Sequence, residues 1–510
     1  MIFSGRYRYF FLFLVVAFGF FWNLGNAPLF DEDEGFFAEG TREMALRGDF
    51  ISTYINQEPR FDKPPLTNWL QYGAAQVLGW NEWAMRLPSA LAALAWMLAI
   101  FLLVRKRLSE KEAFYATFMA TCSLQITIIG KAALADALLN ASMAGAMFCL
   151  YEVLQGSHRK YTFLFYGLSA LGFVSKGPIA VLIPAAVTML YLLRWRSIRP
   201  LWKVLSGSGI LLFLLISLPW YLLQYQQMGQ AFIDGFFFNH NVNRFRTAFE
   251  GHYGSILYFV PILLLGIVPY TAVVLSAFGR LRYLWYDKYF SFHLLWFAFV
   301  FVFFSLSGTK LHHYIIYGYT PLFVLGAWYM ANNHSVPLIW PLLVFLIILL
   351  VAPFMLPQFL PMINDAYAVD VTNGAAAEFD QEYYLSMGGL LLVLLVVEVR
   401  KGWGKDLQLV VVGLVLLITI NGLWMPRLGA LLQQPVKEAA RLARERKYQP
   451  LVVLDHYYPS FHFYSGLFAE ERTPRSGDVV LARKYRLNGI ANKEILFEKH
   501  GLVLARITGP

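Results

Sequence analysis

An acidic segment stands out in a chain that otherwise carries few charges. Only 15% of the 510 residues are charged, yet Asp31, Glu32, Asp33 and Glu34 follow one another at the start of DEDEGFFAEGTREM. Asp33 and Glu34 lead into an amphipathic pattern that is typical of a helix lying in the membrane interface. A charge at the membrane edge is costly unless it is used, so we expect these two residues to act as a general base or to hold a cation. Asp31 and Glu32 are expected to be solvated.

A rigid turn about twenty residues later places an acid next to a base. In RFDKPPLTNWL, Asp62 and Lys63 precede two prolines, which hold the local backbone extended and keep a helix from forming there. Lys63 could bind a phosphate as a point charge while Asp62 orients it. The alternative is a solvated ion pair.

Further polar residues are expected on the same side of the membrane. Asp136 in GKAALADALLN would begin a membrane helix, where it could cap the helix or act as a functional acid. Three later segments, SKGP, FFFNHNVNRF and LSGTKLHHYIIY, supply Lys176, His240, Asn241, Arg244, Lys310, His312, His313 and Tyr314. Cations stabilise a phosphate as charge builds on it. Together with the carboxylates, they indicate a site for a lipid phosphate.

The elements that must position these residues are membrane helices. The chain is 58% hydrophobic with a mean hydropathy of +0.51, which one water-soluble core cannot bury. Apolar stretches long enough to cross the hydrocarbon predict an all-α polytopic membrane protein with about thirteen transmembrane helices, the first near 9–26 and the last near 408–425. The net charge of +10 comes from basic residues in short loops, and no nucleic-acid partner is expected.

Basic residues gather in alternate loops, near residues 105–111, 159–160, 194–203, 280–288 and 400–405. The positive-inside rule places these loops in the cytoplasm. The opposite, periplasmic face then carries the long loops, at about 27–82, 227–255 and 356–384. The charged acids and bases singled out above fall on that face.

Two domains are predicted. Residues 1–428 should form the transmembrane domain with its periplasmic loops. Residues 429–510 begin with the helical run PVKEAARLARERK and continue with PLVVLDHY, DVVLARKY and GLVLARI. Short β-rich runs separated by turns predict a small α/β domain, here on the periplasmic face.

In their order these motifs resemble those of the bacterial aminoarabinose lipid A transferases. Those enzymes belong to the GT-C glycosyltransferases, as do the protein mannosyltransferases. The matching stretches are Asp33-Glu34, Ala38-Glu39, Arg42-Glu43-Met44, Phe61-Asp62-Lys63-Pro64 and Leu134-Ala135-Asp136, followed by SKGPIA, FFFNHNVNRF and SGTKLHHYI. The resemblance covers about residues 10–330. It departs from the family pattern at Asp62, where the family has Glu.

The resemblance implies a GT-C fold in the bacterial inner membrane and a polyprenyl-phosphate-linked sugar donor used on the periplasmic side. It implies that Asp33 is the leading catalytic carboxylate, with Glu34 and Asp136 close by. The residues that it places on the donor phosphate are Lys63, Arg244 and Lys310. No metal site or cofactor is predicted for this chain; members of the family can hold a divalent metal ion, and Asp33 and Asp136 are the residues where one would bind. The acceptor would be lipid A, another glycolipid, a glycan or a protein.

Two other functions remain open from the sequence. A transporter or flippase of lipid-linked sugars would need broken helices and a charged site at mid-membrane, whereas the unusual charges here fall at one face. A lipid-linked oligosaccharide polymerase or O-antigen ligase would use the same kind of donor, so only its product would distinguish it.

Overall fold

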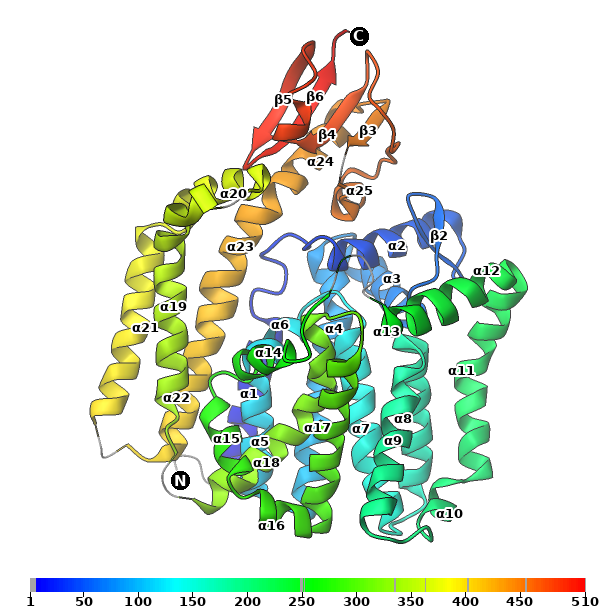
Figure 1. Cartoon of the computed structure of the whole chain (residues 1–510), viewed down its shortest axis with the longest axis vertical. Coiled ribbons are helices and arrows are strands. Elements are labelled where there is room, and N and C mark those ends of the chain that lie inside the picture. The colour runs from blue at the N-terminus through cyan, green and yellow to red at the C-terminus, as the bar shows by residue number, and fades with distance from the viewer. Residues whose placement is uncertain are drawn as a thin grey trace.

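The computed structural model of the protein describes residues 6–509 apart from 248–250, 252, 334–335, 363, 401–402 and 455. Its helices form a large bundle, and a second group of helices stands beside this bundle (Figure 1). A small domain with a four-stranded sheet lies beyond one end of the helices, and a layer of short elements separates it from the bundle (Figure 1).

The bundle is built around a helix, α7, that is buried over almost its whole length. It packs against α4 and α8, and small residues along it let these helices approach closely. At Gly145, for example, a Cβ atom would meet the Leu168 side chain at 2.8 Å. The bundle helices are α1 (Arg6–Phe21), α4 (Glu82–Arg107), α5 (Glu110–Thr121), α6 (Leu124–Ile129), α7 (Asp136–Leu154), α8 (Lys160–Lys176), α9 (Ile179–Arg194), α10 (Leu201–Val204), α11 (Gly207–Met228), α14 (Phe259–Gly266), α15 (Thr271–Phe278), α16 (Leu281–Tyr286), α17 (Lys288–Leu306), η2 (His312–Gly318) and α18 (Tyr319–Asn332).

The second group of helices exposes many large apolar side chains, as expected where lipid is the solvent. On α21, for instance, Leu385 is 68% and Leu392 is 62% exposed. Its elements are α19 (Ile339–Met355), η3 (Leu356–Met362), α20 (Ala366–Glu378), α21 (Gln381–Val399), α22 (Lys405–Ile418), η4 (Thr419–Trp424) and α23 (Met425–Leu432).

Seven helices among the described residues are long and apolar enough to cross a membrane. The count is eight if α14 and α15, which meet at a bend of 117°, form one span. The predicted multi-pass, mostly helical fold is confirmed, whereas the count of thirteen spans stays a prediction. Several expected spans consist of shorter pieces: the stretch expected at 113–130 is α5 followed, after a break, by α6.

A layer of short elements lies across one end of the bundle (Figure 1). It contains α2 (Asp33–Arg47), β1 (Thr53–Ile55), β2 (Glu58–Arg60), α3 (Leu66–Leu78), α12 (Gln230–Phe232), η1 (Ile233–Asn243) and α13 (Arg244–Arg246). The amphipathic helix expected after the acidic segment is α2. Its polar side is covered, because Glu39 and Glu43 are completely buried and α25 of the small domain packs against it.

The small domain is an α/β unit, as predicted. The expected β-rich runs form β3 (Leu451–Leu454), β4 (Val479–Arg483) and β6 (Leu502–Ile507), and the sheet order is β3-β4-β6-β5. Within this sheet β3 and β4 pair in parallel, and the β4-β6 and β6-β5 pairs are antiparallel. Apolar residues of α24 and α25 cover one face of the sheet. The remaining elements are α24 (Gln434–Arg446), α25 (Pro459–Ser465), η5 (Lys484–Leu487) and β5 (Lys493–Lys499).

Candidate active site

A cavity of about 810 Å³ lies where the short-element layer meets the bundle and the small domain. Apart from Glu34 and Asn241, its lining contains all the residues that the sequence predicted for the site, namely Asp33, Asp62, Lys63, Asp136, Lys176, His240, Arg244, Lys310, His312, His313 and Tyr314. These residues come from segments far apart in the sequence. The fold therefore gathers the acids and the cations into one chamber, which we call the main cavity.

Asp33 is the first residue of α2, and its side chain is exposed in the main cavity. The N-terminal end of a helix favours a carboxylate there. Among the described residues, none forms a hydrogen bond or an ion pair with this side chain. The carboxylate is thus placed to meet a substrate.

Glu34 faces away from the main cavity and is only 4% exposed. Both of its carboxylate oxygens receive hydrogen bonds from Arg86, at 2.8 and 2.6 Å. They also accept the backbone N–H groups of Phe30 at 2.9 Å and Ala133 at 2.7 Å. Although burial alone would raise the pKa of Glu34, its contacts with Arg86 lower it below the usual range. With its oxygens engaged in this way, Glu34 joins α2 to the segment that leads into α7.

The turn at Asp62 and Lys63 is a charged cluster. An Asp62 oxygen lies 3.1 Å from the Arg60 guanidinium and 3.7 Å from the Lys63 ammonium. Burial opposes the charged form of Asp62, but the two cations hold its pKa well below its usual range. Burial lowers the pKa of Lys63 to about 8, and Arg244 and Lys176 act in the same direction. The turn therefore places the Lys63 ammonium, next to its partner Asp62, in the lining of the main cavity.

Asp136 begins α7 and is held by two partners. Lys176, at the end of α8, lies 2.6 Å from Asp136 Oδ1, and the hydroxyl of Tyr317 donates a hydrogen bond to the same oxygen at 2.8 Å. Gly177 follows with φ +82°, a left-handed conformation that suits glycine. Asp136 therefore orients Lys176 at the wall of the main cavity.

The ammonium of Lys310 faces backbone carbonyl groups, although the resemblance implies a contact with the donor phosphate. Its ammonium donates hydrogen bonds to the carbonyls of Phe304 at 3.2 Å, Ser305 at 2.7 Å and Ser307 at 2.6 Å, at the end of α17. An ammonium has three donors, and all three are used here. A phosphate contact at Lys310 stays a prediction.

A second, more apolar cavity of about 360 Å³ continues from the main cavity. The two cavities share Asp62, Lys63, Lys176, His240, Arg244 and Tyr314. The second cavity then runs along apolar side chains, among them Ile179, Leu182, Phe245, Phe303 and Phe304. We call it the apolar groove. It joins the main cavity at the cationic end.

The described residues do not fit a divalent cation at Asp33 and Asp136. No group of three or more His, Cys, Asp or Glu side chains in the described part of the chain is placed to hold a metal ion. Asp136 instead faces the cation of Lys176.

Sequence reasoning missed several residues of the main cavity. Asp31 was expected to be solvated, but its carboxylate accepts hydrogen bonds from the backbone and the hydroxyl of Ser460. The small domain supplies these contacts where it packs against α2, and the acidic segment itself carries no signal for them. His456 and Tyr457 also line the cavity. They follow the first strand of the small domain, and the carboxyl end of a parallel strand is a common place for binding residues.

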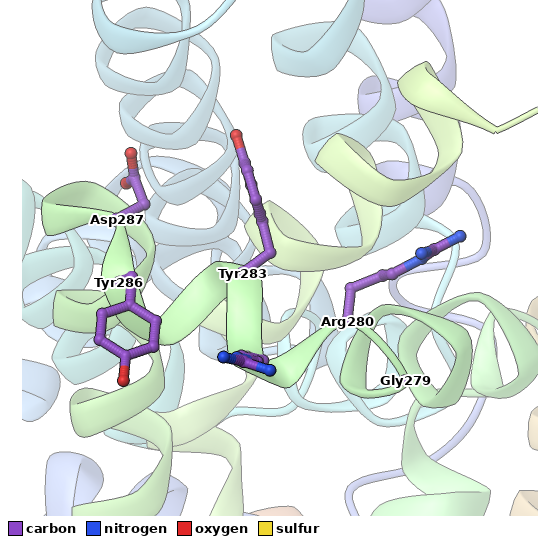
Figure 2. A pocket seen from close by; sticks show the side chains of 6 residues that line it. Gly279, Arg280, Tyr283, Tyr286 and Asp287 are labelled. Atoms are coloured by element: carbon purple, nitrogen blue, oxygen red, sulfur yellow. The ribbon is translucent and has the colours of Figure 1, made fainter.

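Another hollow, of about 640 Å³, lies around α16 (Figure 2). Its lining residues are Gly279, Arg280, Arg282, Tyr283, Tyr286 and Asp287. Arg280 and Tyr283 point in different directions (Figure 2). Asp287 is engaged as the cap of α17, where it accepts the N–H groups of Tyr289 and Phe290. This hollow has no convergent set of groups for chemistry.

Comparison with known proteins gives both a matching family and individual relatives. The family of dolichyl-phosphate-mannose-protein mannosyltransferases matches residues 62–221. An uncharacterised protein of Aquifex aeolicus (strain VF5) is 32% identical over 328 residues, which are 64% of this chain and 74% of that protein. An undecaprenyl phosphate-alpha-4-amino-4-deoxy-L-arabinose arabinosyl transferase of Edwardsiella ictaluri (strain 93-146) is 30% identical over 316 residues, or 60% of this chain. The match spans 56% of the length of that transferase.

Among solved structures, ArnT from Cupriavidus metallidurans shares the fold over nearly the full length. Its structure bound to undecaprenyl phosphate superposes with a TM-score of 0.80 at 18% identity, covering 99% of both chains. The apo structure gives a TM-score of 0.76 at 19% identity. The fold and the site thus define a membrane protein of the GT-C class. The chain belongs to the ArnT and protein mannosyltransferase family of GT-C glycosyltransferases.

Proposed function

We propose that the protein transfers a sugar from a polyprenyl-phosphate donor to an acceptor in the bacterial envelope. One observation carries the proposal: the apolar groove opens into the main cavity at Lys63, Lys176 and Arg244. A polyprenyl phosphate fits this arrangement, because its apolar chain can lie in the groove while its phosphate lies among the cations at the end that joins the main cavity. Named relatives that use undecaprenyl-phosphate-linked aminoarabinose support the same donor class.

The chemistry follows from the placement of Asp33. With the phosphate at the cations, the anomeric carbon of the sugar projects toward the acidic end of the main cavity. Asp33 accepts the proton of an acceptor hydroxyl as its oxygen forms a bond to the anomeric carbon. The bond from that carbon to the phosphate oxygen breaks, and polyprenyl phosphate leaves with the electron pair. Attack opposite the leaving group inverts the anomeric configuration.

The cations stabilise the leaving phosphate. Lys63 and Arg244 line both cavities, so they face the point at which charge builds up. Asp62 holds Lys63 in place and Asp136 holds Lys176. Glu34 positions the start of α2 through Arg86 and Ala133. In this account Asp62, Asp136 and Glu34 act through the residues that they hold, and Asp33 is the acid that accepts the proton of the acceptor hydroxyl.

We assign the main cavity to the periplasmic face of the inner membrane. The loops rich in Lys and Arg lie at the other ends of the helices, which the positive-inside rule places in the cytoplasm. The transmembrane domain would comprise residues 1–428 and the small periplasmic domain residues 429–510. Lipid A is the first acceptor to test because the named relatives are aminoarabinose transferases; other glycolipids, glycans and proteins remain as alternatives.

A flippase of lipid-linked sugars would bind its substrate at broken helices within the membrane. The bent pair α14 and α15 is the one apolar helix pair among the described residues that turns by more than 40° at a short break. Neither of these helices contains a charged residue. The polar groups of the site instead lie at one end of the bundle.

The test is mass spectrometry of envelope lipids and glycans from a strain that lacks the gene. We expect one class of molecule to lose a single sugar and the wild-type gene to restore it. The gene carrying Asp33→Asn should not restore it, whereas Glu58→Gln should, because Glu58 is an exposed residue of β2 outside the cavity lining. An unchanged set of lipids and glycans in the deletion strain would contradict the proposal.

A further inference from the structure

Two residues of the small domain, His456 and Tyr457, line the main cavity together with Asp33. They lie between β3 and α25. All other lining residues come from the part of the chain between positions 31 and 314. The small domain therefore contributes a wall to the chamber that holds the proposed base.

Polar contacts seat this wall against the rest of the protein. The Asp31 carboxylate accepts the backbone N–H of Ser460 at 2.9 Å and also accepts its hydroxyl. The hydroxyl of Tyr464 accepts the backbone N–H of Leu29 at 2.8 Å and donates to Glu82 at 2.9 Å. These contacts hold both ends of α25, so the preceding His456–Tyr457 pair has a defined position over the cavity.

A glycine allows the close approach that these contacts need. A Cβ atom on Gly35 would lie 2.3 Å from Asp31 Oδ1 and 2.8 Å from the backbone nitrogen of Ser460. Any larger residue would push the small domain away from the start of α2. Gly35 lies on α2, the helix that begins with Asp33, so the position of the small domain depends on that helix.

The wall lies at the end of the main cavity away from the donor. The apolar groove shares Lys63, Lys176 and Arg244 with the main cavity, but it shares none of Asp33, His456 and Tyr457. A donor whose lipid tail follows the groove places its phosphate among the cations. The second substrate must then approach Asp33 from the side of the wall.

The side chains of the wall suit a sugar ring. His456 Nε2 lies 3.6 Å from a carboxylate oxygen of Glu32, and the Tyr457 ring stacks on Phe36 with centroids 6.2 Å apart. An imidazole and a carboxylate offer both hydrogen-bond donors and acceptors, and the Tyr457 ring, which also stacks on His462 with centroids 4.8 Å apart, adds apolar ring surface to the cavity lining. A few polar groups beside an apolar surface are what fixes the orientation of a small ligand.

We propose that His456 and Tyr457 bind the acceptor through a polyhydroxylated sugar head group and so determine which acceptor is used. This inference rests on the proposed sugar transfer. It gives the small domain a direct part in the site: the acceptor lies between these two residues and Asp33, with its attacking hydroxyl at the carboxylate.

The test uses full-length protein and two measurements for each variant. The first is the amount of sugar-modified product in the complemented deletion strain. The second is the binding of undecaprenyl phosphate to the purified protein, measured by native mass spectrometry. The variants are His456→Ala, Tyr457→Ala and Lys63→Ala, with His456→Gln as a conservative change. Tyr485→Ala in η5 is the matched control, since Tyr485 belongs to the same domain but does not line the cavity.

We expect His456→Ala and Tyr457→Ala each to lower the product about tenfold, as for a lost ligand contact of about 1.4 kcal/mol, with undecaprenyl phosphate binding unchanged. His456→Gln should recover part of the product, and Lys63→Ala should lose both product and binding. Product at the wild-type level in both alanine variants would overturn the proposal. So would an equal loss of undecaprenyl phosphate binding, which would indicate a purely structural role. If the proposed function itself were wrong, the wild-type protein would form no product, which is a separate outcome.

Discussion

The ammonium of Lys176 lies 2.6 Å from the carboxylate of Asp136, and this ion pair joins the end of α8 to the start of α7. Tyr317 donates to the same carboxylate oxygen at 2.8 Å, which brings η2 to the same point. Both charged side chains are largely buried. The pair thus fixes three elements at the wall of the main cavity and presents Lys176 to it.

Removing one partner of this pair should destabilise the protein. Asp136→Asn leaves the Lys176 ammonium buried without its counter-charge, which typically costs about 3–5 kcal/mol. Lys176→Met leaves the Asp136 carboxylate buried without its positively charged partner, which should destabilise the protein in the same way. Replacing both partners removes the unpaired charge, so the double variant should unfold at a higher temperature than either single variant. Thermal unfolding of the detergent-solubilised protein measures this order. If the double variant unfolded at a temperature as low as that of the less stable single variant, the result would argue against a structural ion pair.

Glu34→Gln should affect stability rather than chemistry. The change leaves the buried Arg86 without a charged partner, and we expect a loss of about 3–5 kcal/mol. The protein that still folds should transfer sugar at a rate close to that of the wild type, measured per folded molecule. Unfolding temperature and activity are determined on the same preparation. If Glu34→Gln kept its unfolding temperature but lost all transfer, Glu34 would have to be counted as catalytic after all.

The binding of undecaprenyl phosphate should weaken as the pH rises through the pKa of Lys63. Burial lowers this pKa to about 8, so Lys63 is charged below that pH and loses its charge above it. Between about pH 7.5 and 9 the charged fraction falls roughly eightfold, and the affinity should fall by a similar factor. Lys63→Arg should bind with little change over this range, because arginine stays charged. Equal pH dependence in the two proteins would remove Lys63 from the phosphate site.

At Asp31 we expect a pH effect on the stability of the protein. Burial raises the pKa of Asp31 to about 7, above its value in an unfolded chain. The folded protein therefore binds a proton that the unfolded chain releases, and stability falls as the pH rises toward about 7. Asp31→Asn cannot release this proton and can still accept a hydrogen bond from Ser460. Its unfolding temperature should exceed that of the wild type at about pH 8 and match it only below about pH 4, where the carboxyl group of the wild type is protonated in both the folded and the unfolded state. A variant that is less stable at both values would contradict this account.

The sequence predicted much of the site because its motifs carry side chains that are scarce elsewhere in the chain. Asp33, Asp62, Lys63 and Asp136 all line one cavity, as expected for charges gathered at one membrane face. The difference between Asp33 and Glu34 was not predictable. Neighbours on a helix point about 100° apart, so one meets the cavity while the other meets Arg86, which only the fold reveals.

Other features depend on tertiary packing. Asp31 and Ser460 meet across most of the length of the chain, and the acidic segment holds no sign of that partner. Lys310 matches a motif of the family, yet its ammonium caps α17. The expected number of spans depended on continuous apolar stretches, whereas breaks such as the one between α5 and α6 divide them.

The central claim is that the Asp33 carboxylate accepts the proton of the acceptor. The most direct measurement is sugar transfer by purified Asp33→Asn protein, with undecaprenyl phosphate binding and unfolding temperature determined alongside. We predict that transfer falls at least about 100-fold, as for the loss of a general base, while binding and stability stay at the wild-type level. Transfer at the wild-type rate by this variant would contradict the account.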